Sequence, residues 1–387
     1  MILKPDNSRE YSILTLGGML VYNRYYLRPA DLQSKQMFQE LYGKAGIAPL
    51  DEYFGIDFIP FRISCEAALK ICKTALDSGS FADAERKIQS MFHVHVSDDI
   101  IRKVVLCIGS IVQAGLIEES KAATEKYNID SIRAGKMRGR PASDAFHLYM
   151  EAALTGESTY VCSTYTVSCA GQRVSQRHLM YSRCTIDEFK TVMVREALST
   201  GLNKAREMVV LVDGTDEIAT ACREVFPFAT FILNMRYLKK HFSAFSAQLV
   251  KSQVNTAYRA DYFFRHALKY IEAGEPEKIF KMQEMENKKK LRARQNAIDK
   301  IHRFLDSKKE LLQYPAFKAN GYLIGNDLPD KEQILFEEGK LATVGSMWSS
   351  ESAAFYLPLY AKYISGEWRT EIMPLVRERY NGWGFNP

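Results

Sequence analysis

The sequence predicts a mixed α/β protein, with a sheet of parallel and antiparallel strands joined to regions that are mainly helical. Residues 208–212 and 229–233 are continuous apolar runs of strand length, and a helical stretch connects them, as in a parallel βαβ unit. Residues 159–168 and 177–185 are strand-like and precede this unit as an antiparallel pair. Most of the chain after residue 235 has helical periodicity.

Length, charge and cysteine content narrow the class of protein. A chain of 387 residues has room for two or three domains, at roughly 150 residues per domain. The net charge of +6 permits nucleic-acid binding without requiring it. None of the seven cysteines forms a CxxC pair, which argues against a zinc site and indicates buried free thiols in a reducing compartment.

Neither a secretion signal nor a membrane-spanning segment is expected. The first residues lack the apolar core of a signal peptide, and no stretch is expected to supply the roughly 18 apolar residues that span a bilayer. We therefore expect a soluble, cytoplasmic protein without membrane contact.

A β-hairpin is expected near the N-terminus. Two β-rich runs within residues 11–28 flank Gly17-Gly18, which is a turn signal between strands.

A helical hairpin follows, and it has the layout of a helix-turn-helix. Residues 81–91 and 100–109 have helical spacing, and Ser97 is a suitable N-cap for the second helix. Arg102 and Lys103 lie near the start of that helix, where a recognition helix meets base edges and phosphates. A plain helical hairpin without DNA contact fits the same pattern.

Two further segments are basic. Residues 131–142 form a linker in which Arg138-Gly139-Arg140-Pro141 resembles the core of an AT-hook, a peptide that lies in a narrow minor groove. Helices expected within 281–309 carry the densest basic cluster, which could contact phosphates or form a solvated helix face. The cluster consists of Lys288, Lys289, Lys290, Arg292 and Arg294.

Asp213 is well placed to carry chemistry. It follows the buried strand expected at 208–212 and precedes Gly214 and a helix. Sites in α/β sheets form at the carboxyl ends of strands, so a carboxylate there could bind a metal. Asp-Gly is also a common turn, so this signal alone is not specific.

Several segments around and after Asp213 occur in an informative order. They are residues 212–214 (Val-Asp-Gly), 225–229 (Val-Phe-Pro-Phe-Ala), 232–238 (Ile-Leu-Asn-Met-Arg-Tyr-Leu), 314–325 and 344–349. Together they resemble transposases of bacterial insertion sequences related to the Mutator-like superfamily. Those proteins show a strand ending in Asp-Gly, a Phe-Pro-x-Ala step, a strand ending in Asp-x-x-His, a Gly-Ser-Gly-x-x-Glu motif and a Gly-Met-x-Trp element.

The resemblance implies an RNase H-like core with three catalytic carboxylates, two from strands and one from a helix. In such enzymes the carboxylates hold two divalent cations for in-line attack on a phosphodiester, and Mg²⁺ suits their oxygen ligands. The resemblance also implies double-stranded DNA as partner and self-association as a homo-oligomer.

The chain departs from the family pattern at the catalytic positions. Asp213 is retained, but Asn234 stands where the family has its next Asp, and Arg236 adds a positive charge nearby. The position of the family's Glu aligns with Asp330. The strand expected at 159–168 holds no acid, although the family shows an early Asp. Loss of several carboxylates is hard to reconcile with two-metal catalysis.

Other acids could replace the missing ones if strands or motifs lie elsewhere. Glu151 and Glu157 would qualify only if the first strand of the sheet lies upstream of 159–168. A shifted alignment would instead use Asp216, Glu217, Asp327 or Glu332.

We therefore expect a transposase-derived DNA-binding protein that is catalytically inactive and acts as an architectural, regulatory or targeting factor, in the nucleoid if the source is bacterial. No cofactor is expected, and Asp213 and Asp330 would hold Mg²⁺ only in an active enzyme. One alternative is an active metal-dependent transposase or nuclease with displaced acids. Another is a protein–protein scaffold that binds no nucleic acid.

The expected domains follow from these segments. They are a β-hairpin region (1–60), a helix-turn-helix-like DNA-binding domain (61–130), a basic linker (131–145) and an RNase H-like core (146–387) with a helical insertion at about 240–315.

Overall fold

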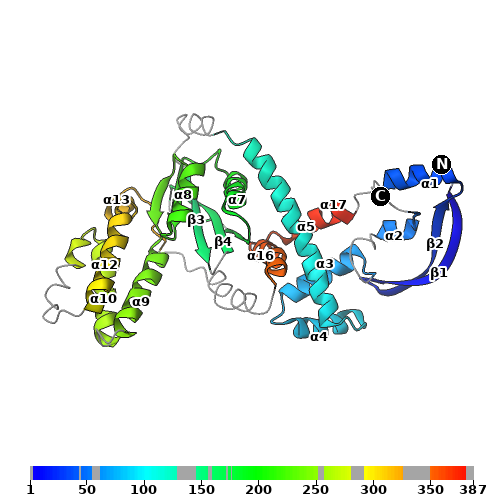
Figure 1. The fold of residues 1–387 in the computed structure, drawn as a ribbon, viewed down its shortest axis with the longest axis horizontal. Helices are drawn as coiled ribbons and strands as arrows, with labels where there is room; N and C mark the ends of the chain where they lie inside the picture. The colour runs from blue at the N-terminus through cyan, green and yellow to red at the C-terminus, as the bar shows by residue number, and fades with distance from the viewer. Residues whose placement is uncertain are drawn as a thin grey trace. The chain divides into compact units, whose positions relative to one another are not determined.

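The protein has a mixed α/β fold with a five-stranded sheet and a separate two-stranded sheet (Figure 1). The computed structural model describes residues 3–42, 45–54, 62–128, 145–155, 159–170, 173–175, 177–251, 257–279, 292–325 and 349–380. By packing, the chain forms two compact units. One holds Met1–Glu118 together with Met347–Pro387, and the other holds Glu119–Ser346.

The first unit begins with the β-hairpin that the sequence predicts. Strand β1 (Leu3–Thr15) pairs antiparallel with β2 (Gly18–Pro29), and Thr15 lies opposite Gly18 at the turn. Gly18 has a φ of 103°, a conformation that glycine adopts without steric cost. Strand β1 begins well before the predicted run, at Leu3, whereas β2 ends one residue beyond it, at Pro29.

Helices make up the rest of this unit. Ser64 and Ser80 cap α3 and α4, since their hydroxyls accept hydrogen bonds from Ala67 N and Asp83 N. The helices are α1 (Leu32–Tyr42), α2 (Pro49–Phe54), α3 (Cys65–Leu76), α4 (Phe81–Phe92), α5 (Asp98–Glu125), α16 (Ser350–Ile364), the π-helical turn η3 (Trp368–Ile372) and α17 (Met373–Tyr380).

Helix α5 is much longer than the predicted 100–109, so that boundary was wrong. The Ser97 hydroxyl accepts from Ile100 N at its start, as expected. The helix continues through Gly109, where the absence of a side chain leaves room for the backbone of α16 to pack closely. A Cβ there would lie 2.5 Å from the carbonyl oxygen of Phe355.

Helix α5 also corrects the expectation that no apolar stretch could span a membrane. Among the described residues it is the one helix that is long and apolar enough by length and composition. Half of its apolar window is buried within the protein, and the core helix of a soluble protein passes the same test. The buried side chains include Ile101, Val104, Val105 and Ile108, which suits a core helix.

The second unit contains the mixed sheet. Its strands run in the order β5-β4-β3-β6-β7. Strands β3, β4 and β5 pair antiparallel, whereas β6 is parallel to β3 and β7 is parallel to β6. The predicted parallel βαβ unit and the antiparallel pair before it are thus confirmed. The strands are β3 (Phe146–Thr155), β4 (Thr159–Ser168), β5 (His178–Ser182), β6 (Glu207–Val212) and β7 (Thr230–Leu233).

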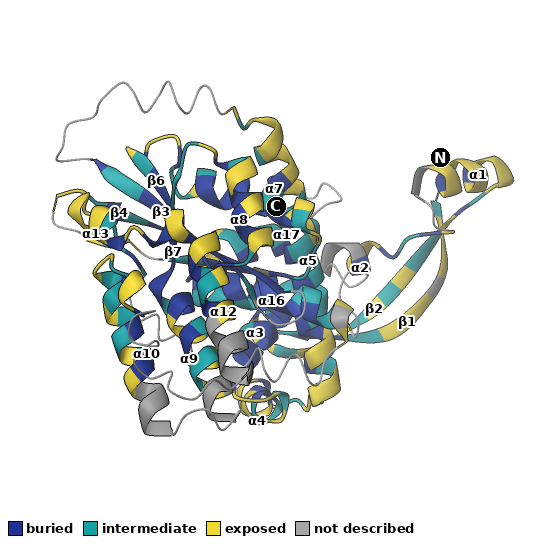
Figure 2. Ribbon diagram, turned by 60° about the vertical axis from the view of Figure 1, so that its left-hand side comes forward, coloured by how far each residue is buried: buried dark blue, intermediate teal, exposed yellow. Residues whose placement is uncertain are grey.

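Strand β3 is the central strand, and the sequence analysis did not predict it. The strand expected to open the sheet, 159–168, is in fact the second, β4, and pairs with β3 along its whole length. Strands β3, β4 and β6 are buried along most of their residues (Figure 2). Glu151 therefore lies inside the sheet, on its first strand.

Two helices that connect consecutive strands pack against the sheet. Helix α7 (Ile186–Ser199) lies between β5 and β6 in the chain and contacts β4. Helix α8 (Asp216–Val225) lies between β6 and β7 and contacts β3 and β6. A capping box begins α7, with Thr185 and Glu188 each bonding the other's backbone N–H. The helix ends before the turn around Gly201, whose φ of 104° is a conformation that glycine adopts without steric cost.

The described elements that follow β7 up to Ala319 are helical. Helix α9 packs against both α10 and α12. The segments are α9 (Met235–Lys251), α10 (Ala257–Glu272), α12 (Arg292–Ser307), the 3₁₀ turn η1 (Lys309–Leu312) and α13 (Tyr314–Ala319).

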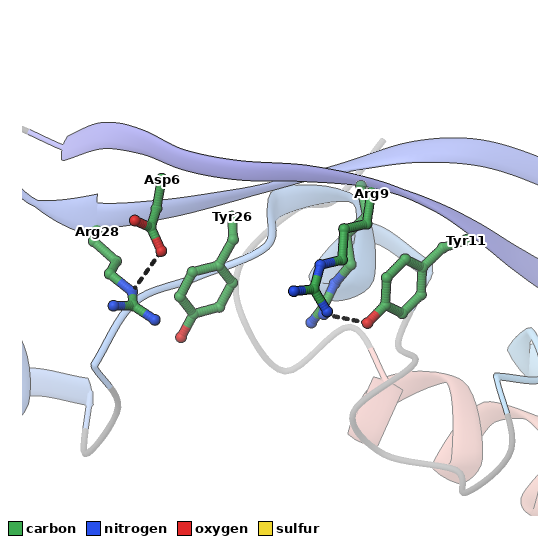
Figure 3. Close-up of a pocket in the computed structure, with 6 residues that line it drawn as sticks. Asp6, Arg9, Tyr11, Tyr26 and Arg28 are labelled. Carbon is green, nitrogen blue, oxygen red and sulfur yellow. Dashed lines mark hydrogen bonds and ion pairs between the residues drawn. The ribbon is translucent and has the colours of Figure 1, made fainter.

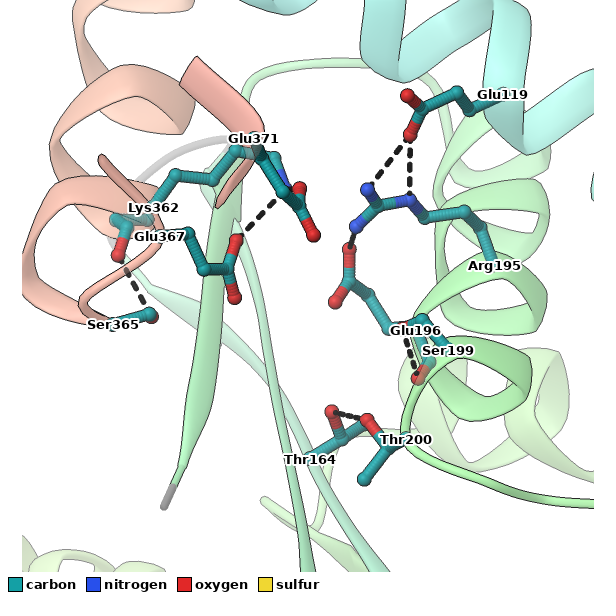
Figure 4. A network of polar contacts seen from close by, with 11 residues as sticks. Glu119, Thr164, Arg195, Glu196, Ser199, Thr200, Lys362, Ser365, Glu367 and Glu371 are labelled. Atoms are coloured by element: carbon teal, nitrogen blue, oxygen red, sulfur yellow. Dashed lines mark hydrogen bonds and ion pairs between the residues drawn. The ribbon is translucent and has the colours of Figure 1, made fainter. Parts of the chain in front are cut away.

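Each unit buries a charged network. In the sheet unit, Arg195 bonds Glu119 and Glu196, at 2.7 and 2.5 Å (Figure 4). In the other unit, Lys362 bonds Glu367 at 3.0 Å. In these networks each buried charge has a partner of opposite charge, which offsets the free-energy cost of removing the charge from water.

The cysteines only partly match expectation. All seven are free thiols, but only Cys72, Cys162 and Cys222 are buried, and Cys169 is exposed.

Substitution of Gly109 by alanine should destabilise the first unit. Alanine is favoured over glycine within a helix by about 1 kcal/mol, but overpacking typically costs about 1–3 kcal/mol. Because the new Cβ would meet a backbone oxygen, we expect a lower free energy of unfolding in denaturant titrations. Gly79→Ala is the control, since nothing lies within 4 Å of its Cβ. A Gly109→Ala protein as stable as the wild type would contradict this packing.

Candidate functional site

The candidate site lies where β3, β6 and β7 approach their carboxyl ends. Ala152 pairs with Val212, and Val212 pairs with Leu233. Asp213 and Asn234 therefore leave adjacent parallel strands at the same edge of the sheet. Glu151, Asp213 and Asn234 are only 6%, 3% and 1% exposed. Polar groups at this depth must find partners within the protein.

Glu151 is held by three donors from different strands and loops. Its Oε1 accepts from the Arg177 guanidinium at 3.0 Å and from the Tyr165 hydroxyl at 3.1 Å. Its Oε2 accepts from the Asn234 amide at 3.3 Å. The carboxylate is thus paired with a cation and hydrogen-bonded on both oxygens.

Arg177 is fixed by an aromatic stack as well as by the ion pair. Its guanidinium carbon lies 4.5 Å from the ring centroid of Tyr165, within the range of a cation–π contact. Tyr165 stacks on Tyr149, with centroids 5.3 Å apart and planes 9° from parallel. Burial, and then the nearby charge of Glu151, raises the pKa of Tyr165 well above its usual value, so the hydroxyl stays a donor.

Asp213 is used to shape the turn after β6. Its Oδ1 accepts from the backbone N and the hydroxyl of Thr215, at 2.9 and 2.8 Å. Its Oδ2 accepts from Leu154 N at 2.9 Å, which joins the turn to β3. Gly214 has a φ of 95°, and a Cβ there would lie 3.4 Å from His241 Nε2. Asp213 therefore has a clear structural role in this turn.

Asn234 supplies both a donor and an acceptor. Its Nδ2 donates to Glu151, and its Oδ1 accepts from Arg236 N at 2.9 Å. An aspartate at this position could not donate to Glu151, and it would place a like charge beside it. Gly325 closes over this amide, because a Cβ at residue 325 would lie 2.2 Å from Asn234 Oδ1.

These residues do not fit a two-metal site. A cation near Glu151 would meet the positive charge of Arg177, and the amide of Asn234 turns its NH₂ group toward the carboxylate. Within the described part of the chain, no group of three or more His, Cys, Asp and Glu residues is arranged to hold a metal ion.

The alternative acids that the structure describes are engaged elsewhere. Asp216 bonds the buried amine of Lys308 at 2.5 Å, and Glu217 accepts from the Tyr160 hydroxyl at 2.7 Å. The remaining acidic candidates lie outside the described residues. They are Glu157, Asp327, Asp330 and Glu332.

The basic residues of α5 are paired along their own helix. Asp99 bonds Lys103 at 2.6 Å and Arg102 at 3.2 Å. The Lys103 amine, and then Arg102, lowers the pKa of Asp99 below its usual value, which keeps the carboxylate charged. The positive charge at the start of this helix is therefore partly balanced.

The other predicted DNA-binding residues are not placed. Arg138, Arg140 and Lys288–Lys290 lie outside the described residues. Arg292 and Arg294 belong to α12, but their side chains are not described.

Comparison with known proteins leaves the family open. No protein-family model matches the chain, and neither does any curated protein sequence.

Sequence reasoning found Asp213 and Asn234 but did not anticipate the pairing of Glu151. One signal was present, because Glu151 is a lone charge inside the apolar run 148–154. A buried acid of this kind needs a cationic partner, but nothing in the sequence singles out Arg177.

Removal of Arg177 should destabilise the protein strongly only while Glu151 keeps its charge. Both side chains are largely buried, at 14% and 7% exposed. We expect Arg177→Met to lower the free energy of unfolding by about 3–5 kcal/mol, because it leaves an uncompensated buried carboxylate. In a double-mutant cycle, Glu151→Gln should recover part of this loss.

Lys190, which pairs with the exposed carboxylates of Asp187 and Glu224, is the control. Because both carboxylates stay in contact with water when the lysine is removed, Lys190→Met should change the free energy of unfolding by less than about 1 kcal/mol. Additive effects of Arg177→Met and Glu151→Gln would mean that the two residues do not stabilise one another.

Proposed function

We propose that this protein is a transposase-derived DNA-binding protein whose RNase H-like core no longer cuts DNA. The proposal combines the sequence resemblance with the sheet topology and with the contacts of Glu151. It includes self-association and a location in the cytoplasm, or in the nucleoid of a bacterial source.

The topology of the sheet supports an RNase H-like core. An RNase H-like sheet has an antiparallel meander whose first strand pairs in parallel with later strands that follow helices. Here β3, β4 and β5 form such a meander, and β6 and β7 extend it on the other side of β3. Under this proposal, Glu151 corresponds to the family's early Asp, and Asp213 corresponds to the acid at the end of a later strand.

The proposed loss of cleavage rests on the pairing of Glu151 with Arg177 and Asn234. An arginine guanidinium here supplies the positive charge that a metal ion would supply in an active site. Both members of the pair are largely buried and bonded to each other, so neither is directed at a phosphodiester. The proposed activity is therefore DNA binding in an architectural, regulatory or targeting role.

One observation favours an active metal-dependent enzyme as the second candidate. Two acids, Glu151 and Asp213, lie at the same edge of the sheet, where the family's catalytic acids would be. An active enzyme would have to break the pairing of Glu151 with Arg177 when DNA binds.

The proposal predicts salt-sensitive binding of duplex DNA without cleavage. Fluorescence anisotropy of a labelled duplex should show affinity that falls with salt, with a log–log slope of roughly −0.9 for each phosphate neutralised. Incubation of the complex with Mg²⁺ or Mn²⁺ should leave the duplex intact.

Asp213→Ala serves as the control for residual activity. Metal-dependent cleavage by the wild type that this variant abolishes would establish the active enzyme instead. Absence of duplex binding at low salt would contradict the proposal and favour a scaffold that binds no nucleic acid.

A further inference from the structure

A face of the N-terminal hairpin gathers arginine and tyrosine side chains around a hollow of about 260 Å³ (Figure 3). Arg9 lies opposite Arg24 across the two strands, so the two side chains share one face. Figure 3 shows the labelled side chains pointing to the same side of the ribbon. The hollow is lined by Asp6, Arg9, Tyr11, Arg24, Tyr26 and Arg28. We call these residues the hairpin face.

The arginines of the hairpin face are held in place by tyrosine rings. The Arg24 guanidinium carbon lies 4.7 Å from the ring centroid of Tyr11, and its Nη1 donates to the Tyr11 hydroxyl at 3.1 Å. Arg28 lies 5.4 Å from the ring of Tyr26. Contacts of this kind orient planar guanidinium groups before any ligand binds, which lowers the entropy lost on binding.

The face keeps a net positive charge after its internal pairing. Arg28 pairs with Asp6 at 3.1 Å, and Arg24 pairs with the buried carboxylate of Asp51 at 2.5 Å. Arg9 is exposed on the same face. Arg62 adds a further charge, with its guanidinium carbon 4.0 Å from the centroid of Tyr11. The positive charges of four arginines therefore exceed the negative charges of the two aspartates that pair with them.

The spacing of the charges favours a long polyanion over a single phosphate ion. Arg24 and Arg28 are four residues apart on β2, or about 13 Å at 3.3 Å per residue. This spacing of backbone positions spreads the arginines along the strand, as the phosphates are spread along a nucleic-acid backbone. Guanidinium forks match phosphate oxygens in geometry, so a row of arginines suits a phosphate backbone.

We propose that the hairpin face binds the phosphate backbone of double-stranded DNA. The choice of DNA as polyanion rests on the proposed function. The surface itself is a separate assignment, because it shares no residue with the sheet edge or with the start of α5. The hairpin would lie along the duplex and contribute affinity without reading the sequence.

The test compares duplex binding by two double variants across a salt series. Arg9→Ala with Arg28→Ala removes two charges from the hairpin face. Arg377→Ala with Arg379→Ala removes two arginines of the same unit that are 46% and 40% exposed, and each pairs with a carboxylate as Arg28 does. Circular dichroism and thermal melting check that both variants fold like the wild type.

We expect the hairpin variant to bind duplex DNA about tenfold or more weakly at moderate salt. Its log–log salt slope should become shallower by about 1.8, which is two phosphate contacts at 0.9 each. The control should match the wild type. Arg9→Lys with Arg28→Lys should keep the slope, because the charge is retained, which keeps the proposal testable if the alanine variant unfolds.

The outcomes separate this proposal from the proposed function. If the wild type binds duplex DNA and the hairpin variant binds equally well with the same slope, the hairpin assignment is wrong and DNA binding stands. If the wild type binds no duplex, both fail. If poly-glutamate competes as well as duplex DNA at equal charge, the face binds acidic polypeptide and the assignment to DNA is overturned.

Discussion

The sheet unit depends on how a buried carboxylate in its central strand is neutralised. Glu151 lies in β3, between β4 and β6, where a lone charge would cost several kcal/mol to desolvate. Arg177 supplies the opposite charge, and Tyr165 and Asn234 satisfy the remaining oxygen positions. The same contacts link β3, β4, the end of β7 and the segment before β5, so one interaction joins most of the sheet.

This arrangement is also the basis of the proposed loss of cleavage. Catalysis by carboxylates needs oxygens directed at metal ions and substrate, in a position that DNA can reach. Glu151 and Asp213 direct their oxygens at an arginine, an amide, hydroxyls and backbone N–H groups. Asn234 fits this network because an amide can donate to Glu151, which an aspartate cannot.

Sequence periodicity predicted the elements whose signals are local. The hairpin follows from Gly17-Gly18 between β-rich runs, and β6 and β7 follow from their continuous apolar composition. Strand β3 was not predicted, because its Met, Glu and Ala residues favour helices. It is a strand because it pairs with neighbours on both sides in the centre of the sheet.

Signals that depend on distant partners could not be read from the sequence. The predicted helix 100–109 stopped at Gly109, whereas that glycine lies within a longer helix and leaves room for the backbone of Phe355, far along the chain. The partner of Glu151 lies 26 residues away, on a segment whose position only the fold determines. The candidate site was therefore located at Asp213 and Asn234, whereas its electrostatic centre, the pairing of Glu151 with Arg177, was not anticipated.

The measurement that tests this account most directly is Mn²⁺ binding by isothermal titration calorimetry, with the wild type compared with Glu151→Gln. If Arg177 and Asn234 neutralise the Glu151 carboxylate in place of a metal ion, the wild type should show no stoichiometric Mn²⁺ site beyond the background of the variant. A stoichiometric site in the wild type that is absent from Glu151→Gln would contradict the account, because the carboxylate would then be available to a metal.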